Sequence, residues 1–104
     1  MQNVVVRYRT KPGRADENQA LVEAVFAELA AKEPEGLRYA TFRLSDGVTF
    51  VHVASVDTAD GVNPLTKTGA FAAFTQAIGE RCDEPPVALD ATVVGSYRFF
   101  PEAE

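Results

Sequence analysis

Hydrophobic and polar residues alternate in four segments of the chain, and two segments between them repeat their apolar residues every three or four positions. Alternation with a period of two is typical of half-buried β-strands, and the longer spacing is typical of amphipathic helices. The alternating segments are residues 3–10, 37–44, 48–56 and 87–100. The helical pattern covers residues 14–33 and the segment that carries Phe71, Phe74, Ile78 and Cys82. The predicted order is strand, helix, strand, strand, helix, strand.

Residues that interrupt regular structure stand at the ends of these elements. Pro12-Gly13 follows the first strand, and Pro34 and Gly36 end the first helix. Asp46-Gly47 separates the second and third strands, and this pair favours a β-hairpin because such turns need positive φ. Asp83-Glu84-Pro85-Pro86 is expected to end the second helix. No stretch has the composition of a linker, so residues 1–104 are predicted to form a single domain.

This order of elements predicts the ferredoxin-like βαββαβ arrangement of the α+β class. In that arrangement a four-stranded antiparallel sheet carries two helices on one face, and the other face needs water or a partner. The more apolar residue set of each strand is assigned to the helix side, which places Tyr39, Thr41 and Arg43 on the opposite side. The helix-facing set is Val4, Val6, Tyr8, Ala40, Phe42, Leu44, Phe50, His52, Ala54, Val56, Leu89, Ala91, Val93, Gly95, Tyr97 and Phe99.

The opposite face of the predicted sheet has an apolar centre with a charged border. The central residues are Val5, Val51, Val53 and Val94, and the border consists of Arg7, Arg9, Arg43 and Arg98. An apolar core with a polar rim is typical of a self-complementary interface, and contiguous exposed apolar patches are uncommon on monomers. We therefore expect a homodimer through this face. The alternative is a solvated sheet whose valines reflect strand propensity.

The composition of the chain argues against two classes of partner, nucleic acids and metal ions. A formal net charge of −5 argues against binding nucleic acid, because phosphate contacts need a basic surface. An RNA-recognition domain of the same topology would also need exposed aromatic residues, and only Tyr39 is a candidate. One histidine and one cysteine give poor support for a metal site. The sequence also lacks a recognisable signal or membrane segment, so a cytoplasmic location is expected.

Four short segments together resemble a known family. They are Arg9-Thr10-Lys11-Pro12-Gly13, Glu35-Gly36-Leu37, Val53 to Asp57, and Phe71-Ala72-Ala73-Phe74. In these residues and their spacing, nearly the whole chain resembles the antibiotic biosynthesis monooxygenase family of dimeric α/β barrels. The resemblance implies two sheets packed face to face across a dimer, with a small-molecule cavity between the sheet and the helices of each subunit.

The chain departs from this family at three positions. Val56 stands where members commonly have tryptophan, and Leu65 stands where they commonly have histidine. The asparagine that haem-degrading relatives use on the first strand corresponds to Val6 or Arg7 here. Haem degradation is therefore not expected, and the resemblance implies chemistry without a cofactor.

His52 is the only histidine, and its unperturbed pKa lies near neutrality. If Tyr8 and Tyr97 share its face, three hydrogen-bonding groups converge on one apolar cavity. The cavity is expected to be lined by Val6, Phe50, Val56, Leu65, Phe71 and Phe74. His52 could take a proton from a flat phenolic or polyketide-like molecule while the tyrosines stabilise the anion.

The resemblance implies that such an anion reacts directly with oxygen, as in a cofactor-independent monooxygenase. Two alternatives stay open: His52 is a structural core residue, or the protein is a non-catalytic dimeric module that binds a small hydrophobic or aromatic metabolite.

Two other features favour structural interpretations. Gly61 to Thr68 nearly matches a phosphate-binding loop, but Thr66 replaces the second glycine and resists the positive φ that the loop needs. We interpret this segment as a lid or connector, in which Lys67 could attract an anionic ligand. Cys82 shares a helix face with Phe74 and Ile78, and is predicted to be a small core residue.

Overall fold

The alternating segments form one four-stranded antiparallel sheet in the computed structural model, which describes residues 1–100. The strands are β1 (Gln2–Thr10), β2 (Leu37–Arg43), β3 (Thr49–Val56) and β4 (Cys82–Ala91). Their order across the sheet is β2-β3-β1-β4, so that β1 and β3 are central and β2 and β4 form the edges.

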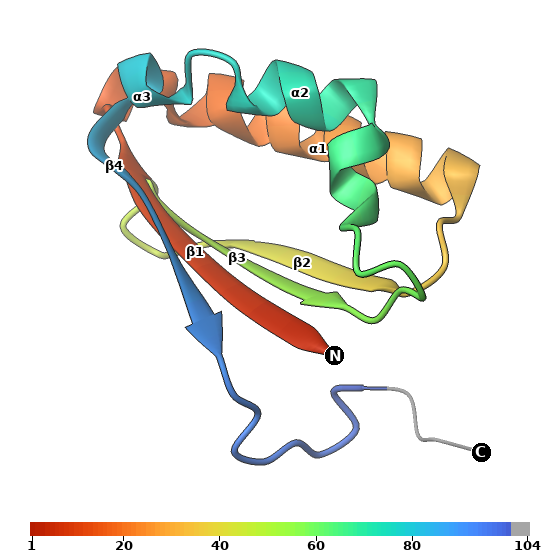
Figure 1. Ribbon diagram of the computed structural model, residues 1–104. Helices are drawn as coiled ribbons and strands as arrows, with labels where there is room; N and C mark the ends of the chain where they lie inside the picture. Colours follow the sequence, from red (N-terminus) through yellow and green to blue (C-terminus); the bar gives the residue numbers. More distant parts are fainter. Residues whose placement is uncertain (101–104) are drawn as a thin grey trace.

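All helices lie over one face of this sheet, and residues 92–100 turn back below the other face (Figure 1), where Phe99 and Phe100 share a pocket with Val53. The helices are α1 (Ala15–Lys32), α2 (Gly69–Thr75) and α3 (Ile78–Arg81), with short 3-10 turns η1 (Pro12–Arg14) and η2 (Pro64–Lys67). The predicted ferredoxin-like α+β fold is therefore confirmed. Among residues 1–100, no helix combines the length and the apolar character that crossing a bilayer requires.

The hairpin between β2 and β3 forms where the Asp-Gly pair predicted it. Gly47 has a φ of 79°, the positive value that such a turn needs. The carboxylate of Asp46 accepts hydrogen bonds from the backbone N–H of Val48 at 2.9 Å and of Thr49 at 2.8 Å. The Thr49 hydroxyl also donates to this carboxylate, and together with the two backbone bonds it lowers the pKa of Asp46 to about 2, the hydroxyl having the largest effect.

The predicted limits of the second helix and the last strand are wrong. The helix breaks after Thr75, because Ala77 has a left-handed φ of 59°. The last strand then begins at Cys82 and ends at Ala91, rather than covering residues 87–100. Pro85 and Pro86 therefore lie inside β4. Two features accommodate them. One side of an edge strand needs no hydrogen-bonded partner, and the register of β4 against β1 shifts between Glu84 and Val87, so the prolines lie where the ladder is irregular.

The predicted facing of β2 and β4 is also wrong. Residues directly opposite in neighbouring strands share a face. Tyr39 lies opposite Ala54 and Thr41 lies opposite His52, so these polar residues of β2 face the helices, while Phe42 faces away. Leu89 of β4 lies opposite Val5 and likewise faces away. Phe42 and Leu89 thus lie on the face that the helices leave uncovered.

The border arginines are divided between the two faces. Arg43 lies on the helix side, where its guanidinium contacts the Asp16 carboxylate of α1 at 3.0 Å and the Gln19 side chain at 2.7 Å. Arg43 therefore pairs within its own chain. Val94 and Arg98 lie beyond the end of β4, so neither extends the apolar patch along the sheet as predicted.

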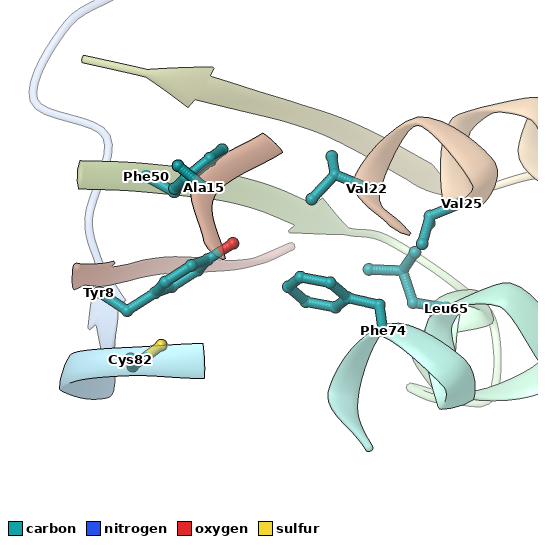
Figure 2. Close-up of a cluster of buried hydrophobic side chains, with 8 residues drawn as sticks. All are labelled: Tyr8, Ala15, Val22, Val25, Phe50, Leu65, Phe74 and Cys82. Carbon is teal, nitrogen blue, oxygen red and sulfur yellow. The ribbon is translucent and has the colours of Figure 1, made fainter. Parts of the chain in front are cut away.

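The core fills the space between α1, α2 and the sheet, and Figure 2 shows Phe74 of α2 projecting toward Tyr8 of β1. The ring centroids of these two residues are 6.2 Å apart. Cys82 is buried in the same cluster, which confirms its predicted core position although it begins a strand. The cluster consists of Tyr8, Ala15, Val22, Val25, Phe50, Leu65, Phe74 and Cys82.

Two glycines with nearly equal φ offer a matched test of packing. Gly36 has a φ of 78°, and a methyl group there would lie 2.6 Å from the carbonyl oxygen of Asp57. Gly47 has a φ of 79° and open space around it. Left-handed strain alone should cost Gly47→Ala about 1 kcal/mol of unfolding free energy. Gly36→Ala should lose about 3 kcal/mol, because it adds a backbone clash.

Denaturant titration of both variants measures the two losses. Equal losses would show that the chain at Asp57 yields to the added methyl group, and that the close approach of Gly36 to this loop contributes little.

Candidate functional site

A pocket of about 260 Å³ lies between the helix-facing side of the sheet and the segment from η2 to α3. Its walls are mainly apolar, and the chief contributors are Val6, Ala54, Leu65, Phe71, Phe74 and Ile78. Its polar side chains include Tyr8, Tyr39, His52 and Asn63. A largely apolar pocket with a few polar groups is the usual form of a small-molecule site, and this volume suits a small flat molecule.

The structure brings most of the predicted site residues to this pocket. Tyr8 and His52 line it together with the predicted cavity residues Val6, Leu65, Phe71 and Phe74. Phe50 and Val56 also face the helices, but they are buried in the core beside the pocket. Tyr97 lies beyond β4 with 80% of its surface exposed, so its predicted position beside His52 is wrong.

His52 sits near the middle of β3 and only 4% of its surface is exposed. Its Nε2 lies 2.7 Å from the hydroxyl of Tyr8. Its Nδ1 lies 2.5 Å from the hydroxyl of Tyr39 and 3.1 Å from that of Thr41. Phe74 covers the ring at a centroid distance of 5.3 Å. Both ring nitrogens are therefore occupied by hydroxyl groups of the protein.

Burial controls the ionisation of these groups. Desolvation lowers the pKa of His52 to about 4, so the imidazole is neutral at pH 7. Desolvation also raises the pKa of Tyr8 and of Tyr39 above the ordinary value for a phenol. Both tyrosines are therefore protonated and can each donate one hydrogen bond.

The hydrogen bonds continue from Tyr8 into α1 and α3. The Asn18 amide nitrogen donates to the Tyr8 hydroxyl at 2.8 Å, and the Arg81 Nε donates to the Asn18 oxygen at 3.2 Å. Arg81 also donates to the carbonyl oxygens of Phe74 at 2.6 Å and Gln76 at 3.2 Å. Arg81 is 3% exposed, and within residues 1–100 no carboxylate lies within 4 Å of it.

Sequence reasoning missed Asn18, Tyr39, Thr41 and Arg81 as parts of this site. Only Asn18 left a usable signal, since it lies three and four residues before Leu21 and Val22 on the apolar face of the helix. A polar residue at such a position needs a buried partner.

The segment between β3 and α2 reaches the pocket through its apolar side chain. Leu65 of η2 is buried and lines the wall, and its backbone N–H donates to the Asn63 side chain at 3.0 Å. Lys67, at the end of η2, is exposed. Within residues 1–100, no group of three histidine, cysteine, aspartate or glutamate side chains could hold a metal ion. The lid role of this segment stays a prediction.

Solved structures share this fold. Rv0793 from Mycobacterium tuberculosis is 17% identical, with a TM-score of 0.72 over 91% of this chain and 96% of that one. A structure described as an antibiotic biosynthesis monooxygenase is 19% identical, with a TM-score of 0.72 over 91% of this chain and all of that one. A Caulobacter crescentus protein provisionally given the same description is 25% identical, with a TM-score of 0.68 over 90% of each chain.

No protein-family model matches the sequence, and no curated protein matches it significantly. The resemblance found in the sequence is thus confirmed through the fold, by solved structures that carry the name of that family.

The neutral state of His52 predicts a loss of stability in mild acid. The imidazole ionises near 6.5 when unperturbed and at about 4 in the folded protein. Between these values the unfolded chain binds more protons, so the unfolding free energy falls as the pH drops through this window. The expected loss is about 3 kcal/mol, complete below about pH 4.

His52→Gln is the matched control, because glutamine has no charge to gain. Its unfolding free energy should change less than that of the wild type between pH 7 and pH 4. Parallel curves in denaturant titrations across this range would contradict the assigned burial of the neutral imidazole. Asp46 also loses stabilisation in acid, starting near its ordinary pKa of 3.8, but both proteins contain it, so its contribution cancels in the comparison.

Proposed function

We propose that this protein catalyses the cofactor-independent oxygenation of a small aromatic molecule that ionises to a phenolate or enolate. The observation that carries the proposal is the position of Tyr39, which lines a mainly apolar pocket and whose hydroxyl is hydrogen-bonded to neutral His52. Solved structures of the same fold that are named antibiotic biosynthesis monooxygenases support the same class of reaction.

The reaction needs no external reductant if the substrate supplies the electrons. An anthrone-like substrate has a methylene group activated by a conjugated carbonyl, and losing a proton to water turns it into an enolate. The enolate transfers one electron to O₂, and the resulting radical and superoxide combine to form a carbon–oxygen bond. The peroxide anion formed in this way takes a proton back from water and becomes a hydroperoxide. Loss of water from the hydroperoxide leaves a carbonyl, so the methylene and O₂ become a ketone and water.

The pocket would contribute mainly by stabilising the anion. Tyr39 is placed to donate a hydrogen bond to the substrate oxygen, where negative charge develops. His52 holds Tyr39 and Tyr8 in position and does not itself reach the substrate, because both its nitrogens are occupied. Apolar walls exclude water and strengthen the bond from Tyr39.

One observation favours a second function, that of a non-catalytic binding module. The pocket contains no free base, since His52 has a low pKa and no unoccupied nitrogen. A module would use the same apolar walls to hold an aromatic metabolite and would not promote its reaction with oxygen.

We further propose that the protein forms a homodimer, with a second copy of this chain packed on the face of the sheet that the helices leave uncovered. This face carries Val5, Arg7, Val51 and Val53 as expected from the sequence, and the structure adds Phe42, Val87 and Leu89. Leu89 is 65% exposed in the single chain. A two-fold axis would place this apolar centre against itself and leave Arg7 at the rim.

Oxygen consumption with anthrone and naphthol compounds tests the catalytic proposal. Tyr39→Phe should lower kcat/KM by about 100-fold, because it removes one donor to the developing anion. Tyr97→Phe removes a comparable hydroxyl outside the pocket and should leave the rate unchanged.

Two results would overturn the catalytic proposal. One is unaltered turnover in His52→Ala, and the other is measurable binding of these compounds without oxygen consumption. The second result would establish the binding module.

Sedimentation of the intact chain tests the dimer. The wild type should sediment as a dimer at micromolar concentration, and Leu89→Asp should sediment as a monomer because it places a charge in the apolar centre. Val62→Asp, at an exposed apolar position on the loop after β3, should remain dimeric. A monomeric wild type would refute the proposed interface.

A further inference from the structure

Five buried or half-buried side chains link the interior of the helical layer to the pocket. In order they are Arg81, Asn18, Tyr8, His52 and Tyr39. We infer that these hydrogen bonds all run in one direction, from Arg81 to the pocket, and that Arg81 thereby makes Tyr39 selective for a ligand oxygen that carries negative charge. This inference rests on the proposed function for its substrate class, and it adds Arg81 as a positioning residue.

The guanidinium fixes the first two bonds. Arginine can only donate, so the Asn18 atom that faces Arg81 Nε is the oxygen. The amide nitrogen of Asn18 must then face Tyr8, and the Tyr8 hydroxyl accepts from it at 2.8 Å. If the Asn18 amide were rotated by 180°, its NH₂ group would face the N–H of Arg81, and no hydrogen bond could form between two donors.

The remaining proton positions follow from this start. Among residues 1–100 the other partner of the Tyr8 hydroxyl is His52 Nε2, so the single proton of Tyr8 points there and Nε2 accepts it. A neutral imidazole carries one proton, which is then on Nδ1. Nδ1 therefore donates to the Tyr39 hydroxyl at 2.5 Å and, more weakly, to that of Thr41 at 3.1 Å.

Tyr39 is left as an acceptor on the protein side and a donor on the pocket side. Its hydroxyl accepts from His52. Burial raises the pKa of Tyr39, and the neighbouring Thr41 hydroxyl lowers it by a smaller amount, so the phenol keeps its proton. Because the bond to His52 uses the Tyr39 oxygen as an acceptor, this proton remains for a ligand oxygen. Each bond in such a chain polarises the next in a low-dielectric interior, so the last donor is stronger than an isolated phenol.

The charge of Arg81 also acts directly on the pocket. Its guanidinium lies 5.6 Å from the centroid of Phe74, a ring that forms part of the pocket wall. Arg81 is buried, and no carboxylate of residues 1–100 lies within 4 Å of it, so its charge raises the electrostatic potential around it. An anion beside Tyr39 is therefore favoured by both the chain and the field, whereas a cationic ligand is opposed by both.

Nitrogen NMR of the free protein tests the direction of the chain. His52 is the only histidine, so its two ring nitrogens can be identified without ambiguity. We expect the tautomer with the proton on Nδ1. A proton on Nε2 would reverse the bonds at Tyr8 and Tyr39 and would overturn the inference, whatever the protein does with oxygen.

Binding of 4-nitrophenol tests the selectivity, since its absorbance reports whether it is ionised. The pKa of the bound phenol should fall by about one unit, equivalent to a tenfold preference for the phenolate. The preference should disappear in Tyr39→Phe, weaken in Arg81→Met and stay unchanged in Tyr97→Phe. Asn18→Leu interrupts the chain while keeping the cation, and provides the test if Arg81→Met does not fold.

The outcomes separate this inference from the proposed oxygenation. A phenolate preference that depends on Arg81, without oxygen consumption, would support the inference and exclude the oxygenase. No binding of 4-nitrophenol, no change in its pKa, or a change that persists in Tyr39→Phe would overturn the inference, even in a protein that consumes oxygen.

Discussion

The buried, uncharged imidazole of His52 requires hydrogen-bonding side chains around it in the interior of the protein. Each nitrogen of His52 needs a partner, since a buried polar atom left without one costs about 1–3 kcal/mol. Each of these partners in turn needs a hydrogen bond of its own. Tyr8 bonds to Nε2 of His52, Asn18 bonds to the hydroxyl of Tyr8, and Arg81 bonds to the amide oxygen of Asn18. On the other side of the imidazole, the same requirement turns Tyr39 of β2 inward. Hydrogen bonds that start at this one residue thus connect an edge strand and two helices to the centre of the sheet.

Much of the fold could be predicted from local patterns. The first helix, the first strand and the hairpin at Asp46-Gly47 lie within two residues of their predicted limits, because periodicity and turn residues act over a few positions. The limits of β4 could not be predicted in this way. Pro85 and Pro86 interrupt a central strand but not an edge strand, and the sequence does not reveal which strand is at the edge.

The site was predictable only in part, for a related reason. His52 and Tyr8 were found because alternation on the central strands β1 and β3 separates apolar from polar faces. On β2, the rule that the more apolar set faces the helices placed Tyr39 and Thr41 outside, although hydrogen bonds to His52 turn them inward. Tyr97 was misplaced because the last strand was extended beyond Ala91. Arg81 had no periodic signal, since its burial depends on partners distant in sequence.

The two prolines within β4 have a consequence for how molecules of this protein can meet. An open strand edge offers unpaired backbone groups to any other extended chain, which is a common route to aggregation. At the margin formed by β4, the two prolines and the irregular register around them interrupt the row of backbone groups that another strand could pair with. Uncontrolled growth of a ribbon from molecule to molecule is therefore discouraged on this side.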